Sequence, residues 1–145
     1  MELKEIIPLL PYQKPFLFVD EISEANENEL FGNYTFREDE YFYQGHFPDY
    51  PVTPGVILIE TMAQIGLVAF GFFLLKDKFD QSPKFAFTSN NTEFYLPVLP
   101  GQKVYVHSKK VYFRLNKLKC LVEMKDEHNN LISRGELSGM ILRQG

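Results

Sequence analysis

The sequence of 145 residues contains very little cysteine and no tryptophan. Because Cys120 is the only cysteine, the chain can form no disulfide within itself, no cysteine-based zinc site and no redox pair. Long polar low-complexity segments are also missing, since 45% of the residues are hydrophobic and 15% are aromatic. This composition is typical of a globular domain with a sizeable core, and we expect a single domain over residues 1–145.

The chain has no excess of positive charge. Its formal net charge of -4 argues against nucleic acid as the main partner. The charge is unevenly distributed, however: residues 1–50 carry eleven acidic and three basic side chains, whereas residues 101–125 carry seven basic side chains and only Glu123 as an acid. The basic stretch fits either a patch that meets an acidic partner or the solvated outer faces of two strands.

A secretory signal is not visible at the N-terminus. The first ten residues include Glu2, Lys4 and Glu5 and lack a basic start followed by a long apolar run. With a single cysteine in the chain, we therefore expect a reducing, cytoplasmic location.

The longest apolar run covers residues 56–75, where Glu60, Thr61 and Gln64 are the only conventionally polar side chains. Its length would suit a membrane-spanning helix. An acidic residue in the first third is costly in a bilayer, and no aromatic and basic flanks support insertion. The run therefore predicts a helix that is apolar on every face and surrounded by the rest of the fold, without a membrane.

Strand-like segments surround this helix in the sequence. We expect a short helix or turn at residues 3–10 and a structured, proline-rich loop at 37–54. Strands are expected at residues 16–22, 30–36, 84–87, 92–96, 103–113, 117–124 and 131–142, with a turn at 127–130. The economical way to bury the helix is to curl the sheet around it, which predicts an α+β hot-dog fold whose sheet edge pairs with a second subunit.

Two polar side chains are candidates for chemistry. His46 lies in the loop that leads into the helix, and Glu60 is the one carboxylate on the helix. A buried carboxyl group raises its pKa or finds a partner, and Gln64, one turn later, can hydrogen-bond to Glu60. An imidazole and a neutral carboxylic acid facing an apolar cavity suit proton removal from carbon coupled to loss of a poor leaving group. Ordinary hydrogen bonding by His46, and a capping or interface role for Gln64, remain alternatives.

The start of the helix offers backbone donors. Its first amides have no partner within the helix and carry a partial positive charge. Because Gly55 allows close approach, the amides of Gly55 and Val56 can bind a carbonyl oxygen and stabilise the enolate of a thioester. Proline and glycine are also common at ordinary helix starts, which is the alternative interpretation.

These residues lie in segments that resemble a known family. The segments are GHFP at 45–48, PVTPGV at 51–56 and ETMAQ at 60–64. Together they resemble the signature of the FabZ-type (3R)-hydroxyacyl-acyl-carrier-protein dehydratases. Residues 10–20 and 94–102 are similar to other parts of that family, so the likeness covers most of the chain, and the 14-residue spacing from His46 to Glu60 makes it specific.

The resemblance implies a fold, an assembly and a reaction. Two protomers with the hot-dog fold would join their sheets, and each active site would combine His46 of one chain with Glu60 of the other. His46 would remove the C2 proton of a 3-hydroxyacyl thioester, and Glu60, supported by Gln64, would protonate the departing C3 hydroxyl. The amides of Gly55 and Val56 would hold the thioester oxygen. Glutamate rather than aspartate at position 60 is typical of dehydratases without isomerase activity.

The resemblance also implies partners. An acyl carrier protein would deliver the phosphopantetheine-linked chain into a tunnel along the apolar helix, in fatty acid synthesis or a related lipid or polyene pathway. No metal or organic cofactor is implied, and the homodimer can assemble as a trimer of dimers. The length of the acyl chain depends on how Phe70, Phe72, Phe73 and nearby strand side chains pack, which the sequence does not determine.

Some positions depart from the family pattern. Tyr12 and Gln13 replace the usual His-Arg, while Asn90, Glu93 and Tyr95 replace Asp, Lys and Arg. The basic residues expected near a carrier-protein entrance are thus missing. Either the basic stretch described above supplies the docking site, or the donor is a specialised carrier or a coenzyme A thioester.

Two other functions stay open. One is a hot-dog acyl thioesterase, in which the acid on the helix activates water. The other is a non-catalytic acyl-thioester binding subunit that pairs with an active partner. His107 and His128 are assigned no role, because they fall in a predicted strand and a polar turn.

Overall fold

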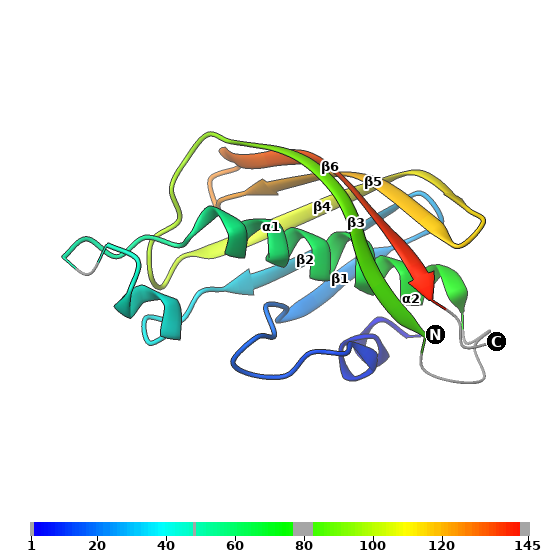
Figure 1. Ribbon diagram of the computed structural model, residues 1–145, viewed down its shortest axis with the longest axis horizontal. Helices are drawn as coiled ribbons and strands as arrows, with labels where there is room; N and C mark the ends of the chain where they lie inside the picture. The colour runs from blue at the N-terminus through cyan, green and yellow to red at the C-terminus, as the bar shows by residue number, and fades with distance from the viewer. Residues whose placement is uncertain (1, 48, 77–82, 143–145) are drawn as a thin grey trace.

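The computed structural model describes residues 2–47, 49–76 and 83–142. Over these residues, six strands form one antiparallel sheet in the order β1-β2-β4-β5-β6-β3. Figure 1 shows the sheet curving over one long helix. The predicted α+β hot-dog fold, with an antiparallel sheet wrapped around a central apolar helix, is confirmed.

The element bounds follow the sequence pattern closely for the later strands. The strands are β1 (Glu21–Ala25), β2 (Glu29–Thr35), β3 (Lys84–Phe94), β4 (Lys103–Arg114), β5 (Lys117–Lys125) and β6 (Leu131–Leu142). The long helix consists of α1 (Gly55–Ala63), the π-helical segment η4 (Gln64–Ala69) and α2 (Phe70–Leu75). The described residues also form the short 3-10 helices η1 (Leu3–Glu5), η2 (Ile7–Leu9) and η3 (Tyr41–Gln44).

The central helix forms the middle of the hydrophobic core. It is the one helix in the described ranges that is long and apolar enough to cross a bilayer, yet 78% of its most apolar stretch is buried inside the fold. Strand β5 shows why the sheet covers it: Leu118, Cys120, Val122 and Met124 are buried, while the residues between them are only partly covered. This period of two turns one face of the strand toward the helix and the basic side chains away from it.

The first predicted strand is displaced in the structure. We expected it at residues 16–22, but β1 begins at Glu21. The backbone just before β1 finds other partners: the Phe18 amide donates to Oε1 of Gln64 at 2.8 Å, and the Phe16 carbonyl accepts from Nε2 of Gln64 at 3.0 Å. A helix side chain thus replaces the neighbouring strand as the hydrogen-bond partner of this segment.

Two predicted strands are one strand in the structure. The segments expected at 84–87 and 92–96 join in β3, which pairs with β6 along its whole length and has an irregularity between Phe87 and Ser89. The residues between the two segments are polar and exposed, and they lie in a strand at the edge of the sheet. Because β3 is the last strand in the sheet order, its outer edge has no strand partner among the described residues.

Candidate active site

The loop before the central helix holds His46 by its imidazole ring. Nδ1 of His46 lies 2.9 Å from the carbonyl oxygen of Val52. Since a carbonyl only accepts, Nδ1 is the donor, and in the neutral imidazole Nε2 is then the nitrogen that can accept a proton. The side chain is half-buried. A general base needs such a free ring nitrogen, so this orientation is compatible with the predicted role of His46.

A buried pair of hydroxyl groups ties the two arms of this loop together. The hydroxyl of Tyr43, on η3, lies 2.6 Å from Oγ1 of Thr53, just before α1. The Thr53 amide also donates to the Val98 carbonyl at 2.8 Å. Next to His46, Phe47 has a left-handed backbone with φ of 57°, which reverses the chain there. These contacts brace the loop against the body of the fold, so that His46 does not depend on a single hydrogen bond for its position.

Glu60 lies on α1, one turn before the π-helical segment. Burial is the main cause that raises the pKa of its carboxyl group, and a hydrogen bond from Gln64 partly opposes the shift. Nε2 of Gln64 donates to Oε2 of Glu60 at 3.0 Å. Because the other amide hydrogen and the oxygen of Gln64 bond to the segment before β1, the amide orientation is determined and holds the carboxyl group in place. A carboxyl group with a raised pKa can remain protonated and act as an acid.

The raised pKa of Glu60 predicts a pH-dependent loss of stability. Ionised Glu60 is unfavourable in the folded state, so the free energy of unfolding should fall as the pH rises from about 4.5 through the raised pKa. Glu60→Gln stays neutral and still accepts the hydrogen bond from Gln64. Its melting temperature should exceed that of the wild type by a few degrees at pH 8 and match it near pH 4.

Thermal denaturation in pH steps, at one protein concentration, checks this prediction. Glu127→Gln is the matched control, because Glu127 is an exposed glutamate in a turn. This control should melt like the wild type across the range. Equal melting temperatures for Glu60→Gln and the wild type at pH 8 would contradict the prediction that ionised Glu60 destabilises the folded state.

The first residue of α1, Gly55, lines an open cleft beside His46. The amides of Gly55 and Val56 have no hydrogen-bond acceptor among the described residues. The cleft has a volume of about 370 Å³ and lies between the loop, the start of α1 and the segment that follows β3. A Cβ atom at Gly55 would lie 3.2 Å from Cζ of Phe94, so the chain passes closely here and a bulkier residue would need Phe94 to shift. The cleft therefore combines the His46 imidazole with the start of a helix whose first amides are unpaired.

The structure brings these predicted residues together in two groups rather than one. His46 and Gly55 line the open cleft, whereas Glu60 lines a separate, smaller cavity with Tyr12. Within one chain, none of the described cavities is lined by both His46 and Glu60. Each chain therefore presents two separate groups of candidate residues, around His46 and around Glu60, which we call the two half-sites.

Tyr12 is a site residue that sequence reasoning identified only as a departure from the family pattern. It lies against Glu60, and burial, with a contribution from the charge of Glu60, raises the pKa of Tyr12 to about 12. The tyrosine hydroxyl is thus protonated at neutral pH. In the sequence, the one feature that could have indicated this role is the position of Tyr12 just before the apolar segment 16–19.

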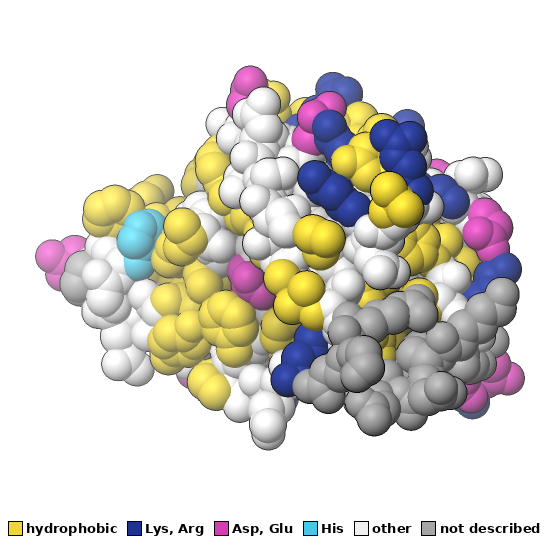
Figure 2. Space-filling view, turned by 45° about the vertical axis from the view of Figure 1, so that its right-hand side comes forward, with side chains coloured by type: hydrophobic (Ala, Val, Ile, Leu, Met, Phe, Trp, Pro, Cys, Tyr) yellow, Lys and Arg dark blue, Asp and Glu magenta, His cyan; other side chains and the backbone are white. Residues whose placement is uncertain are grey.

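The surface near the two half-sites is unusually apolar. Figure 2 shows hydrophobic side chains exposed over this end of the molecule. Those at least 40% exposed near the cleft are Phe47, Tyr50, Val56, Phe94, Tyr95 and Leu96. Together with the unpaired edge of β3, they form a surface of the kind that protein partners cover.

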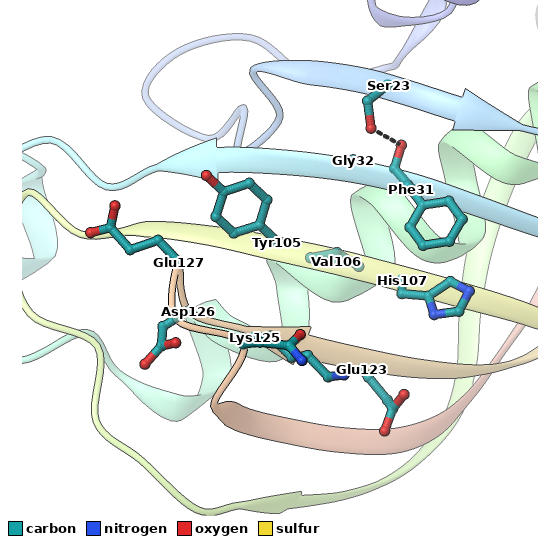
Figure 3. Close-up of a pocket in the computed structure, with 11 residues that line it drawn as sticks. Ser23, Phe31, Gly32, Tyr105, Val106, His107, Glu123, Lys125, Asp126 and Glu127 are labelled. Carbon is teal, nitrogen blue, oxygen red and sulfur yellow. Dashed lines mark hydrogen bonds between the residues drawn. The ribbon is translucent and has the colours of Figure 1, made fainter.

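Another hollow lies on the opposite face of the sheet. It holds about 350 Å³ and is lined mainly by β2, β4, β5 and the turn after β5, with the helix behind the sheet (Figure 3). In it, Nε2 of His107 lies 2.7 Å from Oε1 of Glu29, and the His107 ring stacks on Phe31 with centroids 4.1 Å apart. None of the residues that line this hollow borders the cavities of His46 or Glu60. His107 has structural partners, and the described residues contain no cluster of ligating side chains for a metal ion.

Solved structures of other proteins share this fold. A chain of the dehydratase heterocomplex ApeI:P from Xenorhabdus doucetiae aligns with a TM-score of 0.81 at 13% identity, over 96% of this chain and 91% of that one. A thioesterase from Haemophilus influenzae aligns with a TM-score of 0.72 at 17% identity, over 99% and 92%. At these identities the likeness establishes the hot-dog fold and leaves the reaction open.

Sequence similarity identifies the family. Residues 10–129 match the FabA-like domain. The 3-hydroxyacyl-[acyl-carrier-protein] dehydratase FabZ of Clostridium perfringens strain SM101 is 36% identical over 114 residues, which cover 79% of this chain and 80% of that protein. FabZ of Petrotoga mobilis is 35% identical over 130 residues, or 88% and 90% of the two chains. This chain therefore belongs to the FabA-like family and, within it, to the FabZ 3-hydroxyacyl-[acyl-carrier-protein] dehydratases.

Proposed function

We propose that this chain is a hydro-lyase that converts a 3-hydroxyacyl thioester, carried on acyl carrier protein, to the trans-2-enoyl thioester. The observation that carries this proposal is the hydrogen bond from Nδ1 of His46 to the Val52 carbonyl, which leaves Nε2 of the neutral imidazole free to act as a base in the cleft that Gly55 also lines. A base next to amide donors suits removal of a proton from the carbon adjacent to a thioester carbonyl.

The reaction needs both half-sites. Nε2 of His46 takes a proton from C2, and the electrons of that C–H bond form the double bond between C2 and C3. The C3–oxygen bond breaks as the protonated carboxyl group of Glu60 gives its proton to the departing hydroxyl, which leaves as water. The amides of Gly55 and Val56 stabilise the charge that develops on the thioester oxygen. Transfer of the proton from His46 back to Glu60 through water then restores the starting state.

A homodimer would complete each site. The two half-sites are separate within one chain, the outer edge of β3 has no strand partner among the described residues, and the nearby surface is apolar. Pairing of two β3 edges would join the sheets and bring His46 of one subunit to Glu60 of the other. Assembly of three such dimers into a hexamer is part of the same proposal.

The proposed setting is cytoplasmic fatty acid synthesis, or a related lipid or polyene pathway, with the chain acting as one domain. The only cysteine, Cys120, is free and buried, which suits a reducing compartment. A docking site for the carrier protein is also part of the proposal. Basic side chains project outward from β4 and β5, away from the central helix. They offer an acidic partner a docking surface in place of the basic residues missing from β3.

An assay of wild-type enzyme tests the proposed reaction directly. A short 3-hydroxyacyl thioester, presented once on acyl carrier protein and once on coenzyme A, should give a rise in enoyl absorbance without release of free thiol. Faster turnover of the carrier form would support docking through the basic surface. Thiol release without enoyl formation would instead indicate a thioesterase, and tight binding without turnover would indicate a binding subunit.

A further inference from the structure

The cavity beside Glu60 is short and mostly apolar. It extends along the helix from Glu60 past Ala63 to Leu67 and Val68 and holds about 50 Å³. Strands β3 and β6 form its other wall. A cavity needs roughly 10–15 Å³ to hold one water molecule, which is similar in size to a methylene group. The cavity beside Glu60 therefore has room for about four methylene groups.

A phenylalanine side chain closes the cavity at the next turn of the helix. Phe85, on β3, lines the cavity and packs against Phe72, with ring centroids 5.1 Å apart. Its ring also lies against Gly71: a Cβ atom at Gly71 would be only 2.5 Å from Cε1 of Phe85. Because residue 71 is glycine, the Phe85 ring can lie against the helix. There it fills space that an acyl chain running along the helix would otherwise occupy.

The other phenylalanines of the helix do not form this end wall. Phe70 and Phe72 are fully buried in the core and do not line the cavity. Phe73 borders a different hollow with Leu3 and Ile7, on the side of the helix that faces the N-terminal segment. Phe85 thus occupies a position that none of the three helix phenylalanines shares.

We propose that Phe85, packed against Gly71 and Phe72, ends the acyl-binding cavity and restricts this enzyme to short 3-hydroxyacyl thioesters. This inference rests on the proposed dehydratase function. Carbons C1 to C3 lie at the reacting groups, so the cavity accommodates roughly four further carbons. A chain longer than about seven carbons has to displace the Phe85 ring from a packed site, and forcing extra methylenes into such a site is unfavourable.

Chain-length profiles of the wild type and Phe85→Ala test the proposal. The substrates are 3-hydroxyacyl thioesters of increasing length on one carrier, from four to sixteen carbons, and the measurement is kcat/KM for each. For the wild type, we expect kcat/KM to fall at least about tenfold between six and ten carbons. Phe85→Ala should raise the ratio of kcat/KM for ten carbons to that for six carbons at least about tenfold.

Phe73→Ala is the matched control, because Phe73 is also half-buried and lies on the same helix as Gly71 but outside the cavity. It should leave the chain-length ratio unchanged. If Phe85→Ala does not fold, Phe85→Leu is the second variant. It replaces the ring by a shorter aliphatic side chain with less loss of packing, and it should shift the ratio in the same direction. Equal turnover of long and short chains by the wild type, or an unchanged ratio in a folded Phe85 variant, would overturn the proposal. Absence of dehydration at every chain length would instead count against the proposed function.

Discussion

Replacing His46 with alanine should lower kcat for dehydration by about 10²- to 10⁴-fold. The imidazole supplies the only side-chain base among the residues that line the open cleft, and its Nδ1 bond to the Val52 carbonyl already selects the tautomer that accepts a proton at Nε2. The substitution removes one hydrogen bond from a half-buried loop residue, so the fold should survive. The measurement is the initial rate of enoyl-thioester formation, with the melting temperature recorded for the same preparation.

The chain provides a matched control for this substitution. His107→Ala removes an imidazole of similar exposure from the opposite face of the sheet, where its partners are Glu29 and Phe31. This variant should retain the wild-type kcat. Dehydration at the wild-type rate by a folded His46→Ala protein would rule out His46 as the base.

Mixing two inactive subunits should restore activity if the two half-sites belong to different chains. Glu60→Gln cannot protonate the leaving hydroxyl and should lose at least about a hundredfold in kcat. A dimer of one His46→Ala subunit and one Glu60→Gln subunit contains one site with both His46 and Glu60 intact and one site with neither. Random mixing of equal amounts should therefore give about a quarter of the wild-type activity.

Co-expression of differently tagged subunits, followed by purification over both tags, isolates the mixed dimer, which should have about half of the wild-type activity because one of its two sites is intact. The control pairs His46→Ala with the double variant His46→Ala/Glu60→Gln, which contains no intact site and should stay inactive. If each active site lay within a single chain, the first mixture would be as inactive as its components. Activity in the first mixture and none in the second would locate the catalytic pair at the subunit interface.

Local patterns in the sequence were sufficient to predict the fold class and the nature of the candidate residues. The apolar run that contains Glu60 predicts a buried helix, and the alternation over residues 117–124 predicts a strand with one buried face. Both patterns reflect burial repeated with the period of a regular element, which neighbouring residues encode by themselves. The polar residues that break these patterns, His46 and Glu60, were visible for the same reason.

Contacts between distant segments decided the features that the sequence did not predict. The segment before β1 forms no strand because Gln64, more than forty residues away, binds its backbone. The end of the cavity depends on Phe85 reaching Gly71 from another element. The sequence alone thus determined which segments are buried and which polar residues interrupt them. The tertiary structure decided which of these residues meet, because pairing across the core depends on strand register and side-chain packing rather than on periodicity.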